Sequence, residues 1–333
     1  MFMLLILLFI AACFLAFSNG ANDNFKGVAT LFGAGITNYK KAINWATITT
    51  FSGSVAAIFL AEALVKNFSG KGLVPNELIQ TPTFAIAIAL GAAITVFFAT
   101  KLGMPISTTH SLVGALFGAG VMAVGAEFNF IKLGNTFLMP LIVSPLMAAV
   151  LSLLAYILFR FLTQKTPSLT KEKPTLLGIS SPKILDTLHY LSAGIVSFAR
   201  GLNDTPKIVG LLIIINTIAI EWSMISVAVI MALGGLLNAK KVGETMSKKI
   251  TKMNSGQGFT ANMITGVLVT TASVHGLPVS TTHVSVGSLF GIGMVTKKAD
   301  YKVIGKIVLS WVLTLPIAAI ISAVIFKGLE VVS

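Results

Sequence analysis

Two short motifs place acidic side chains inside apolar segments of this 333-residue chain. The first is "FSNGANDNFK", which contains Asn22 and Asp23, and the second is "FARGLNDTPK", which contains Asn203 and Asp204. An acidic residue at the centre of a membrane helix costs about 2.5 to 3.5 kcal/mol, so such residues usually pair with a cation or line an ion pathway. Each aspartate therefore needs a positive partner.

The motifs offer two kinds of partner. Lys26 and Lys207 each follow the Asp by three residues, which is a neighbour spacing on a helix. The other partner is a small hard cation, because Asn and Asp side chains, with carbonyl oxygens freed by helix breaks at Gly20 and Gly201, offer the all-oxygen coordination that Na⁺ accepts. The sequence leaves both open, and the second predicts a set of Na⁺ ligands: Asn22, Asp23, Asn203 and Asp204.

Two further motifs carry consecutive hydroxyl groups, "GMPISTTH" at 103–110 and "GLPVSTTH" at 276–283. A proline followed by Ser and Thr is typical of a helix start, so each motif predicts the N-terminus of a half-helix. Free N–H groups and the positive end of the helix dipole bind anions there, and several hydroxyls suit a tetrahedral oxyanion. The predicted binding residues for such an anion, phosphate or sulfate, are Ser107, Thr108, Thr109, Ser280, Thr281 and Thr282.

A histidine ends each of these motifs, His110 in the first and His283 in the second. With an ordinary pKa of about 6.5, a histidine there could carry a proton, or it could donate to a backbone carbonyl as a neutral ring. The sequence does not choose between these roles.

The composition indicates a polytopic membrane protein. Of the residues, 55% are hydrophobic and only 11% are charged, and the mean hydropathy is +0.90. Apolar blocks of spanning length predict an all-α fold of about 10–12 membrane segments with broken helices and re-entrant-type helical hairpins. The one cysteine, Cys13, excludes an internal disulfide framework and a Cys-based zinc site.

The chain is an internal duplication. Residues 103–120 return at 276–293 with 12 of 18 positions identical, and the Asn-Asp motif precedes them in both halves. The predicted parts are an N-terminal repeat at 1–160, a cytoplasmic linker at 161–183 and a C-terminal repeat at 184–333. Each repeat has an odd number of crossings, so the repeats are expected to be inverted, with hairpins that enter from opposite faces and meet near the midplane.

The net charge of +13 is distributed unevenly between the loops. Of the 24 Lys and Arg residues, 16 lie in four regions, which are 40–41, 160–183, 240–252 and 297–306. Placing these regions in the cytoplasm satisfies the positive-inside rule and puts both termini outside. The distribution of basic residues thus indicates how the chain is oriented in the membrane, and no nucleic-acid partner is predicted.

The stretches "GANDNFKG" and "GLNDTPK" and the two P-x-STTH motifs resemble the inorganic phosphate transporter family of the PiT type. The resemblance covers both halves and implies half-helix tips that bind phosphate, Asn-Asp motifs that serve cation coupling, and uptake driven by Na⁺ or H⁺. The short linker suits the plasma (inner) membrane of a prokaryote. Many members continue the Asn-Asp pair as Val-Ala-Asn-Ala, whereas this chain has basic residues there, at Lys26 and Lys207.

Charge balance favours cation coupling. A phosphate of charge −1 to −2 beside two aspartates gives −3 to −4, and two helix termini return only about +1. The sequence therefore predicts no enzyme, but a secondary active transporter that imports inorganic phosphate by Na⁺ symport with alternating access. The alternatives are a proton-coupled symporter of sulfate or another tetrahedral oxyanion and, from another class, an anion channel.

An intramembrane hydrolase built from Ser107, His110 and Asp23 is disfavoured, because residues three apart in a capping turn aim poorly for nucleophile and base. The expected partners are phosphate, sodium ions and the lipid bilayer. A homodimer is compatible with the sequence, which does not fix the oligomeric state.

Overall fold

The computed structural model describes residues 2–165, 175–176, 179–215, 219–248 and 253–332. Within these ranges the elements of regular secondary structure are all helices, apart from two two-residue strands, β1 (Thr175–Leu176) and β2 (Ile179–Ser180), which pair antiparallel in the linker. The predicted all-α class is confirmed. Within the predicted linker at 161–183, residues 166–174 and 177–178 lie outside the described residues.

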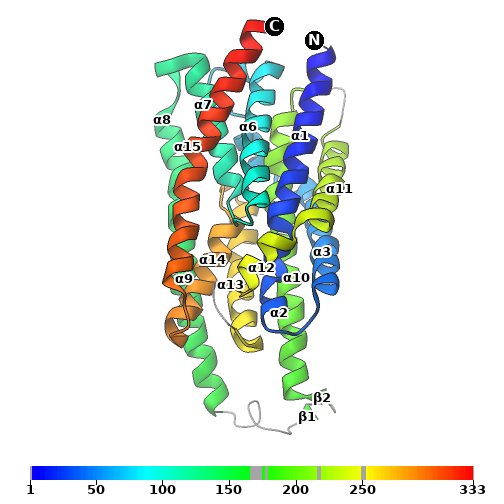
Figure 1. The fold of residues 1–333 in the computed structure, drawn as a ribbon, viewed down its shortest axis with the longest axis vertical. Coiled ribbons are helices and arrows are strands. Elements are labelled where there is room, and N and C mark those ends of the chain that lie inside the picture. The colour runs from blue at the N-terminus through cyan, green and yellow to red at the C-terminus, as the bar shows by residue number, and fades with distance from the viewer. Residues whose placement is uncertain (1, 166–174, 177–178, 216–218, 249–252, 333) are drawn as a thin grey trace.

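The first half contains a long broken helix, a hairpin and a long closing helix (Figure 1). Its α-helices are α1 (Phe2–Asp23), α2 (Ala29–Gly33), α3 (Tyr39–Leu60), α4 (Glu62–Phe68), α5 (Asn76–Ile79), α6 (Pro82–Lys101), α7 (Thr108–Val124), α8 (Phe130–Lys132) and α9 (Met139–Lys165). Two 3₁₀ segments, Asn24–Val28 and Gly125–Glu127, and a π-helical segment, Leu133–Leu138, join them.

The second half repeats this order. Its helices are α10 (Ser181–Val209), a 3₁₀ turn (Gly210–Leu212), α11 (Ile220–Asn238), α12 (Lys240–Lys248), α13 (Ser255–Val274), α14 (Thr281–Thr296) and α15 (Tyr301–Val332). Thus α10 corresponds to α1, α13 to α6, α14 to α7 and α15 to α9.

Seven helical stretches among the described residues are long and apolar enough to cross a membrane: Phe2–Gly33, Tyr39–Leu60, Pro82–Lys101, Thr108–Glu127, Phe130–Leu162, Ile220–Asn238 and Tyr301–Val331. The chain is a multi-pass membrane protein. Helices α10, α13 and α14 are not among the seven. Helix α14 has only 16 residues, and α10 contains five charged residues, Lys183, Asp186, Arg200, Asp204 and Lys207.

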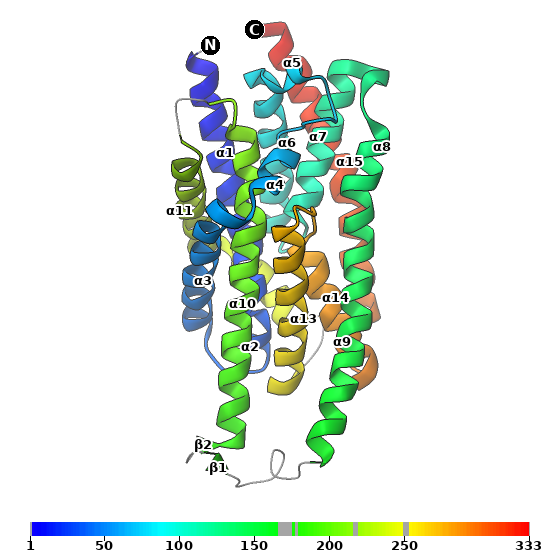
Figure 2. The ribbon, with the colours of Figure 1, turned by 180° about the vertical axis from the view of Figure 1, so that it is seen from behind.

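The two hairpins enter the bundle from opposite ends. Helices α6 and α7 lie toward the end of the molecule that holds both termini, whereas α13 and α14 lie toward the end that holds the linker (Figures 1 and 2). Packing crosses between the halves, since α7 packs on α15 and α14 packs on α9. Each hairpin is thus held by the closing helix of the other half.

Glycines allow this close packing. A Cβ on Gly114 or Gly118 of α7 would lie 2.3 and 2.0 Å from carbonyl oxygens of α15, and one on Gly287 or Gly291 of α14 would lie 2.3 and 2.1 Å from carbonyl oxygens of α9. The motifs "GALFG" and "GSLFG" are therefore helix-contact surfaces, as small residues at this spacing predict.

The expected helix breaks at Gly20 and Gly201 are wrong. Helix α1 continues through Gly20 to Asp23, and α10 continues through Gly201 to Val209. A Cβ at Gly20 would lie 1.9 Å from the Met231 carbonyl oxygen, and one at Gly201 would lie 2.0 Å from that of Thr50. These glycines admit a neighbouring helix backbone, and the carbonyl oxygens beside them belong to continuous helices.

Candidate functional site

The predicted half-helix starts are confirmed. Ser107 is the N-cap of α7, and its hydroxyl accepts from the His110 amide at 3.1 Å; Ser280 is the N-cap of α14, and its hydroxyl accepts from the His283 amide at 3.2 Å. Both seryl side chains satisfy one amide that the first helical turn leaves without a backbone partner. The tips of the two hairpins therefore have the same local structure.

A glycine turn precedes each tip. Gly103 has φ of +72° and Gly276 has φ of +71°, a left-handed conformation that glycine adopts without strain. In each turn the next residue's amide donates back into the ending helix, from Met104 to Ala99 at 2.9 Å and from Leu277 to Ala272 at 2.8 Å. Helices α6 and α13 thus end in Schellman-type caps, which set the entry of the two tips.

The tips touch each other. The Thr282 hydroxyl donates to the Ile106 carbonyl oxygen at 3.1 Å, and in the equivalent contact the Thr109 hydroxyl donates to the Val279 carbonyl oxygen at 3.2 Å. The sequence expectation that oppositely directed tips meet is confirmed by these contacts. An extended backbone carbonyl inside the bundle is in this way satisfied by the other half.

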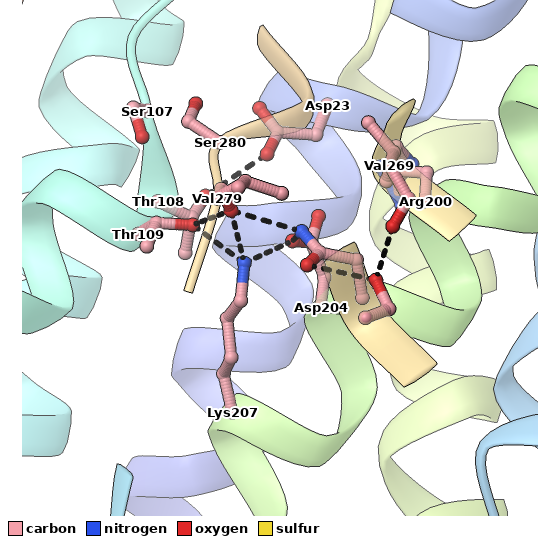
Figure 3. A network of polar contacts seen from close by, with 12 residues as sticks. Asp23, Ser107, Thr108, Thr109, Arg200, Asp204, Lys207, Val269, Val279 and Ser280 are labelled. Carbon is pink, nitrogen blue, oxygen red and sulfur yellow. Dashed lines mark hydrogen bonds and ion pairs between the residues drawn. The ribbon is translucent and has the colours of Figure 1, made fainter. Parts of the chain in front are cut away.

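The lysines cross-link the two tips. Lys26 Nζ donates to the Ile106 carbonyl oxygen at 2.7 Å and to Thr282 Oγ1 at 2.8 Å. Lys207 Nζ makes the equivalent contacts, with the Val279 carbonyl oxygen at 2.8 Å and Thr109 Oγ1 at 2.7 Å (Figure 3). Each ammonium group therefore binds the hairpin of its own half and a threonine of the other half.

The same lysines pair with the two aspartates. Lys26 Nζ forms an ion pair with Asp23 Oδ1, and Lys207 Nζ lies 3.3 Å from Asp204 Oδ1. Of the two partners that the sequence allowed for the carboxylates, the structure contains the lysine. Each lysine can reach its aspartate because the backbone between them is helical. Lys26 lies in the 3₁₀ turn that follows Asp23, the last residue of α1, and both Asp204 and Lys207 lie within α10.

Asn19 links the two carboxylates, which the sequence reasoning missed. Its Nδ2 lies 3.3 Å from Asp23 Oδ2 and 3.3 Å from Asp204 Oδ2. The Thr108 hydroxyl also donates to Asp23 Oδ2, at 3.1 Å. The aspartates from the two halves therefore lie in one polar cluster.

Arg200 is the second residue that was not assigned a role. Its side chain is 1% exposed, its Nη2 lies 3.5 Å from Asn19 Oδ1, and its Nε and Nη1 have no hydrogen-bond partner among the described residues. Asn19 and Arg200 occupy the same position in "FSNGAND" and "FARGLND". Comparing the motifs position by position, one residue before the first Gly, would have identified both.

Two of the predicted Na⁺ ligands, Asn22 and Asn203, form hydrogen bonds with the hairpins. Asn22 Nδ2 donates to the Thr100 hydroxyl at 2.9 Å and to the Met104 carbonyl oxygen at 3.0 Å, and its Oδ1 accepts from Lys26. Asn203 Nδ2 donates to the Val279 carbonyl oxygen at 3.2 Å, and its Oδ1 accepts from Ser273 at 3.1 Å.

The two motif histidines contact each other with ring centroids 4.3 Å apart and ring planes tilted by 46°, and His283 stacks on Trp311 with centroids 3.7 Å apart. Nδ1 of His283 lies 3.4 Å from the Leu141 carbonyl oxygen, which agrees with the backbone-bonded role. Nδ1 of His110 has no partner among the described residues.

The site is enclosed. The six predicted phosphate-binding residues are between 1% and 6% exposed, and the charged residues Asp23, Asp204, Lys26, Lys207 and Arg200 are at most 4% exposed. With both carboxylates ionised and the three basic groups protonated, the side chains carry a net charge of +1 beside two helix N-termini. Such a centre suits an anion.

Three comparisons with known proteins agree with this geometry. The sequence pattern of the Phosphate transporter family matches residues 19–322. The chain belongs to this family. It is a family of transporters and not of enzymes, and the resemblance suggested by the four motifs is confirmed.

Relatives of this family match over nearly the full chain. A Pyrococcus abyssi protein assigned as a phosphate permease is 30% identical, with 98% of each chain covered. A Rhizobium meliloti protein assigned as a low-affinity inorganic phosphate transporter is 28% identical, with 100% of this chain and 98% of the relative covered. The solved structure of a sodium-dependent phosphate transporter matches with a TM-score of 0.87 and 25% identity, over 99% of this chain and 100% of that one. Family and fold thus both support phosphate transport.

Proposed function

We propose that this chain imports inorganic phosphate in symport with Na⁺ by alternating access, and that phosphate binds between the tips of α7 and α14. The observation that carries the proposal is the direct contact of two oppositely directed tips, made through Thr282 with Ile106 and Thr109 with Val279. A site between two inverted hairpins is accessible from one side when one hairpin moves and from the other side when its counterpart moves.

The phosphate ligands in this proposal are Ser107, Thr108, Thr109, Ser280, Thr281 and Thr282, with the free amides of the two helix starts. Several of these hydroxyls are engaged in the enclosed structure: Thr109 and Thr282 accept from lysines, and Thr108 donates to Asp23. Phosphate oxygens would take the place of such internal partners, since an oxyanion accepts from hydroxyl, ammonium and amide donors.

Na⁺ coupling is supported by the likeness to a sodium-dependent transporter and by the local charge. A divalent phosphate would change the side-chain sum from +1 to about −1, which favours a cation entering with it. Among the predicted Na⁺ ligands Asn22, Asp23, Asn203 and Asp204, the lysines contact Oδ1 of both aspartates. We therefore assign Na⁺ to Oδ2 of Asp23 and Asp204, which Asn19 bridges.

For the cellular setting we propose the plasma membrane of a prokaryote, with both termini outside. The termini lie at one end of the molecule and the linker lies at the other (Figure 1). Lys40 and Lys41 lie in the first turn of α3, and Lys297 and Lys298 follow the last residue of α14. These two helix ends lie toward the linker end of the molecule (Figure 1), in agreement with a cytoplasmic location.

The test is uptake of labelled phosphate by the purified full-length chain in proteoliposomes, with Na⁺, K⁺ and pH gradients imposed separately. We expect uptake that follows the Na⁺ gradient, that is lost in Asp23→Asn and Asp204→Asn, and that is strongly weakened in Thr108→Val and Thr281→Val. Lys66→Gln, which alters an exposed ion pair with Glu62, is the control and should transport normally.

Other outcomes identify the alternatives. Uptake that follows the pH gradient and is inhibited by sulfate would replace the proposal with a proton-coupled oxyanion symporter. Flux that is indifferent to every gradient would indicate an anion channel. Light scattering of the same preparation measures the oligomeric state, for which a homodimer is our working hypothesis.

A further inference from the structure

We propose that the ammonium groups of Lys26 and Lys207 act as tethered cations that replace two of the Na⁺ ions the site would otherwise need, so that this chain carries fewer Na⁺ per phosphate. The inference rests on the proposed function, because it concerns the stoichiometry of the same site. It assigns a coupling role to the two lysines that pair with the buried aspartates.

The surroundings of Lys26 are those of a hard cation. Its Nζ contacts Asn22 Oδ1 at 2.8 Å, the Ile106 carbonyl oxygen at 2.7 Å and Thr282 Oγ1 at 2.8 Å, besides Asp23 Oδ1. Carboxylate, amide, carbonyl and hydroxyl oxygens are the ligands that an alkali or alkaline-earth ion takes from a protein. A Na⁺ ion bound by these oxygens would have to displace the ammonium.

The second half contains the same arrangement around Lys207. Lys207 Nζ contacts Asp204 Oδ1 at 3.3 Å, Thr109 Oγ1 at 2.7 Å and the Val279 carbonyl oxygen at 2.8 Å (Figure 3). Each contact has its counterpart around Lys26 at the equivalent position of the other repeat. Each of the two equivalent carboxylates is therefore paired with an ammonium group that belongs to the chain itself, and all four residues are at most 4% exposed.

Charge bookkeeping gives the stoichiometry. With Arg200, the two lysines and the two aspartates, the side chains sum to +1, and a divalent phosphate requires about one Na⁺ for neutrality. Without the lysines the sum is −1, and the same phosphate requires about three Na⁺. Burying uncompensated charge in a membrane is costly, so the number of bound cations should follow this balance.

The consequence concerns the driving force. A co-transported Na⁺ crosses the membrane and contributes its electrochemical gradient, whereas an ammonium group that stays attached to the protein contributes none. Each lysine therefore spares the site one bound Na⁺, but the gradient of that Na⁺ is then no longer available to drive phosphate accumulation. The structure points to a carrier suited to modest phosphate gradients.

The experiment measures initial uptake of ²²Na⁺ and ³²P-phosphate together in voltage-clamped proteoliposomes that contain the full-length chain. The variants are Lys26→Gln and Lys207→Gln. The matched control is Lys327→Gln, which removes the same charge from an exposed i,i+3 ion pair with Glu330. We expect a wild-type ratio of about one Na⁺ per phosphate, an increase of about one for each buried lysine replaced, and no change in the control.

A wild-type ratio of about three, or lysine variants that transport with an unchanged ratio, would overturn the inference. If a variant does not yield a monodisperse protein, the wild-type ratio alone decides. Failures of the two proposals are distinguishable. Absence of any wild-type phosphate uptake would refute the proposed function. Wild-type uptake that is independent of Na⁺, but becomes Na⁺-dependent in Lys26→Gln, would refute only the Na⁺ coupling of the wild type and would support Lys26 as a tethered cation.

Discussion

The buried ion pair between Asp23 and Lys26 can be tested by a double-mutant cycle. The cycle compares the wild type, Asp23→Asn, Lys26→Gln and the double variant. Both side chains are at most 3% exposed, so each single substitution leaves the other charge without its partner inside the bundle. The double variant removes both charges and leaves the net charge of the site unchanged.

The magnitude follows from this burial. Removing one partner of a buried pair costs about 3 to 5 kcal/mol, whereas removing both is often close to neutral. At about 2 °C per kcal/mol for a chain of this size, each single variant should lower the melting temperature by about 6 to 10 °C. The double variant should melt at or above the temperature of either single variant.

The assay is thermal unfolding of the purified full-length protein in one detergent, followed by intrinsic fluorescence. The matched control is the same cycle on Lys327 and Glu330, an i,i+3 pair whose side chains are 63% and 52% exposed; its variants should shift the melting temperature by less than about 2 °C. Shifts that simply add in the Asp23 and Lys26 double variant would show that the two charges do not interact, and would refute the assignment of Lys26 as the counter-ion.

Two further substitutions test the hairpin contacts. Gly291→Ala should lower the melting temperature and phosphate uptake, because its Cβ would lie 2.1 Å from the Ala149 carbonyl oxygen and overpacking costs about 1 to 3 kcal/mol. The control is Gly305→Ala, whose Cβ would meet no atom of the described residues within 4 Å. Equal effects of the two substitutions would contradict the close packing at Gly291. Thr282→Val should reduce phosphate uptake roughly tenfold or more, because it removes the hydrogen bonds to Lys26 and Ile106. The control is Thr296→Val, at a residue whose hydroxyl bonds within its own helix, and it should leave uptake near wild type. Similar uptake by both variants would show that the Thr282 contacts are dispensable.

Local sequence was sufficient where the structure depends on local chemistry. The Pro-x-Ser-Thr-Thr order specified helix starts at Ser107 and Ser280, because capping needs only a hydroxyl and an amide three residues later. Duplicated motifs and the parity of crossings were enough to predict hairpins from opposite ends.

Glycine could not be interpreted without its neighbours. Gly20 and Gly201 were expected to break their helices, but both lie in continuous helices against the backbone of another helix. A glycine that interrupts a helix and one that admits a crossing helix have the same local sequence. The difference depends on which segment packs there, and this is a long-range fact.

By itself the sequence determined the all-helical membrane fold, its duplication and the family, because hydropathy, charge placement and four ordered motifs are properties of the chain alone. Only the tertiary structure decided how the charges pair. Lys26 and Lys207 reach the aspartates and the opposite tip together, and Asn19 and Arg200 join the two halves, through contacts between residues up to 256 positions apart. Electrostatic compensation in a low-dielectric interior depends on distances of a few ångström, and those distances are set by folding.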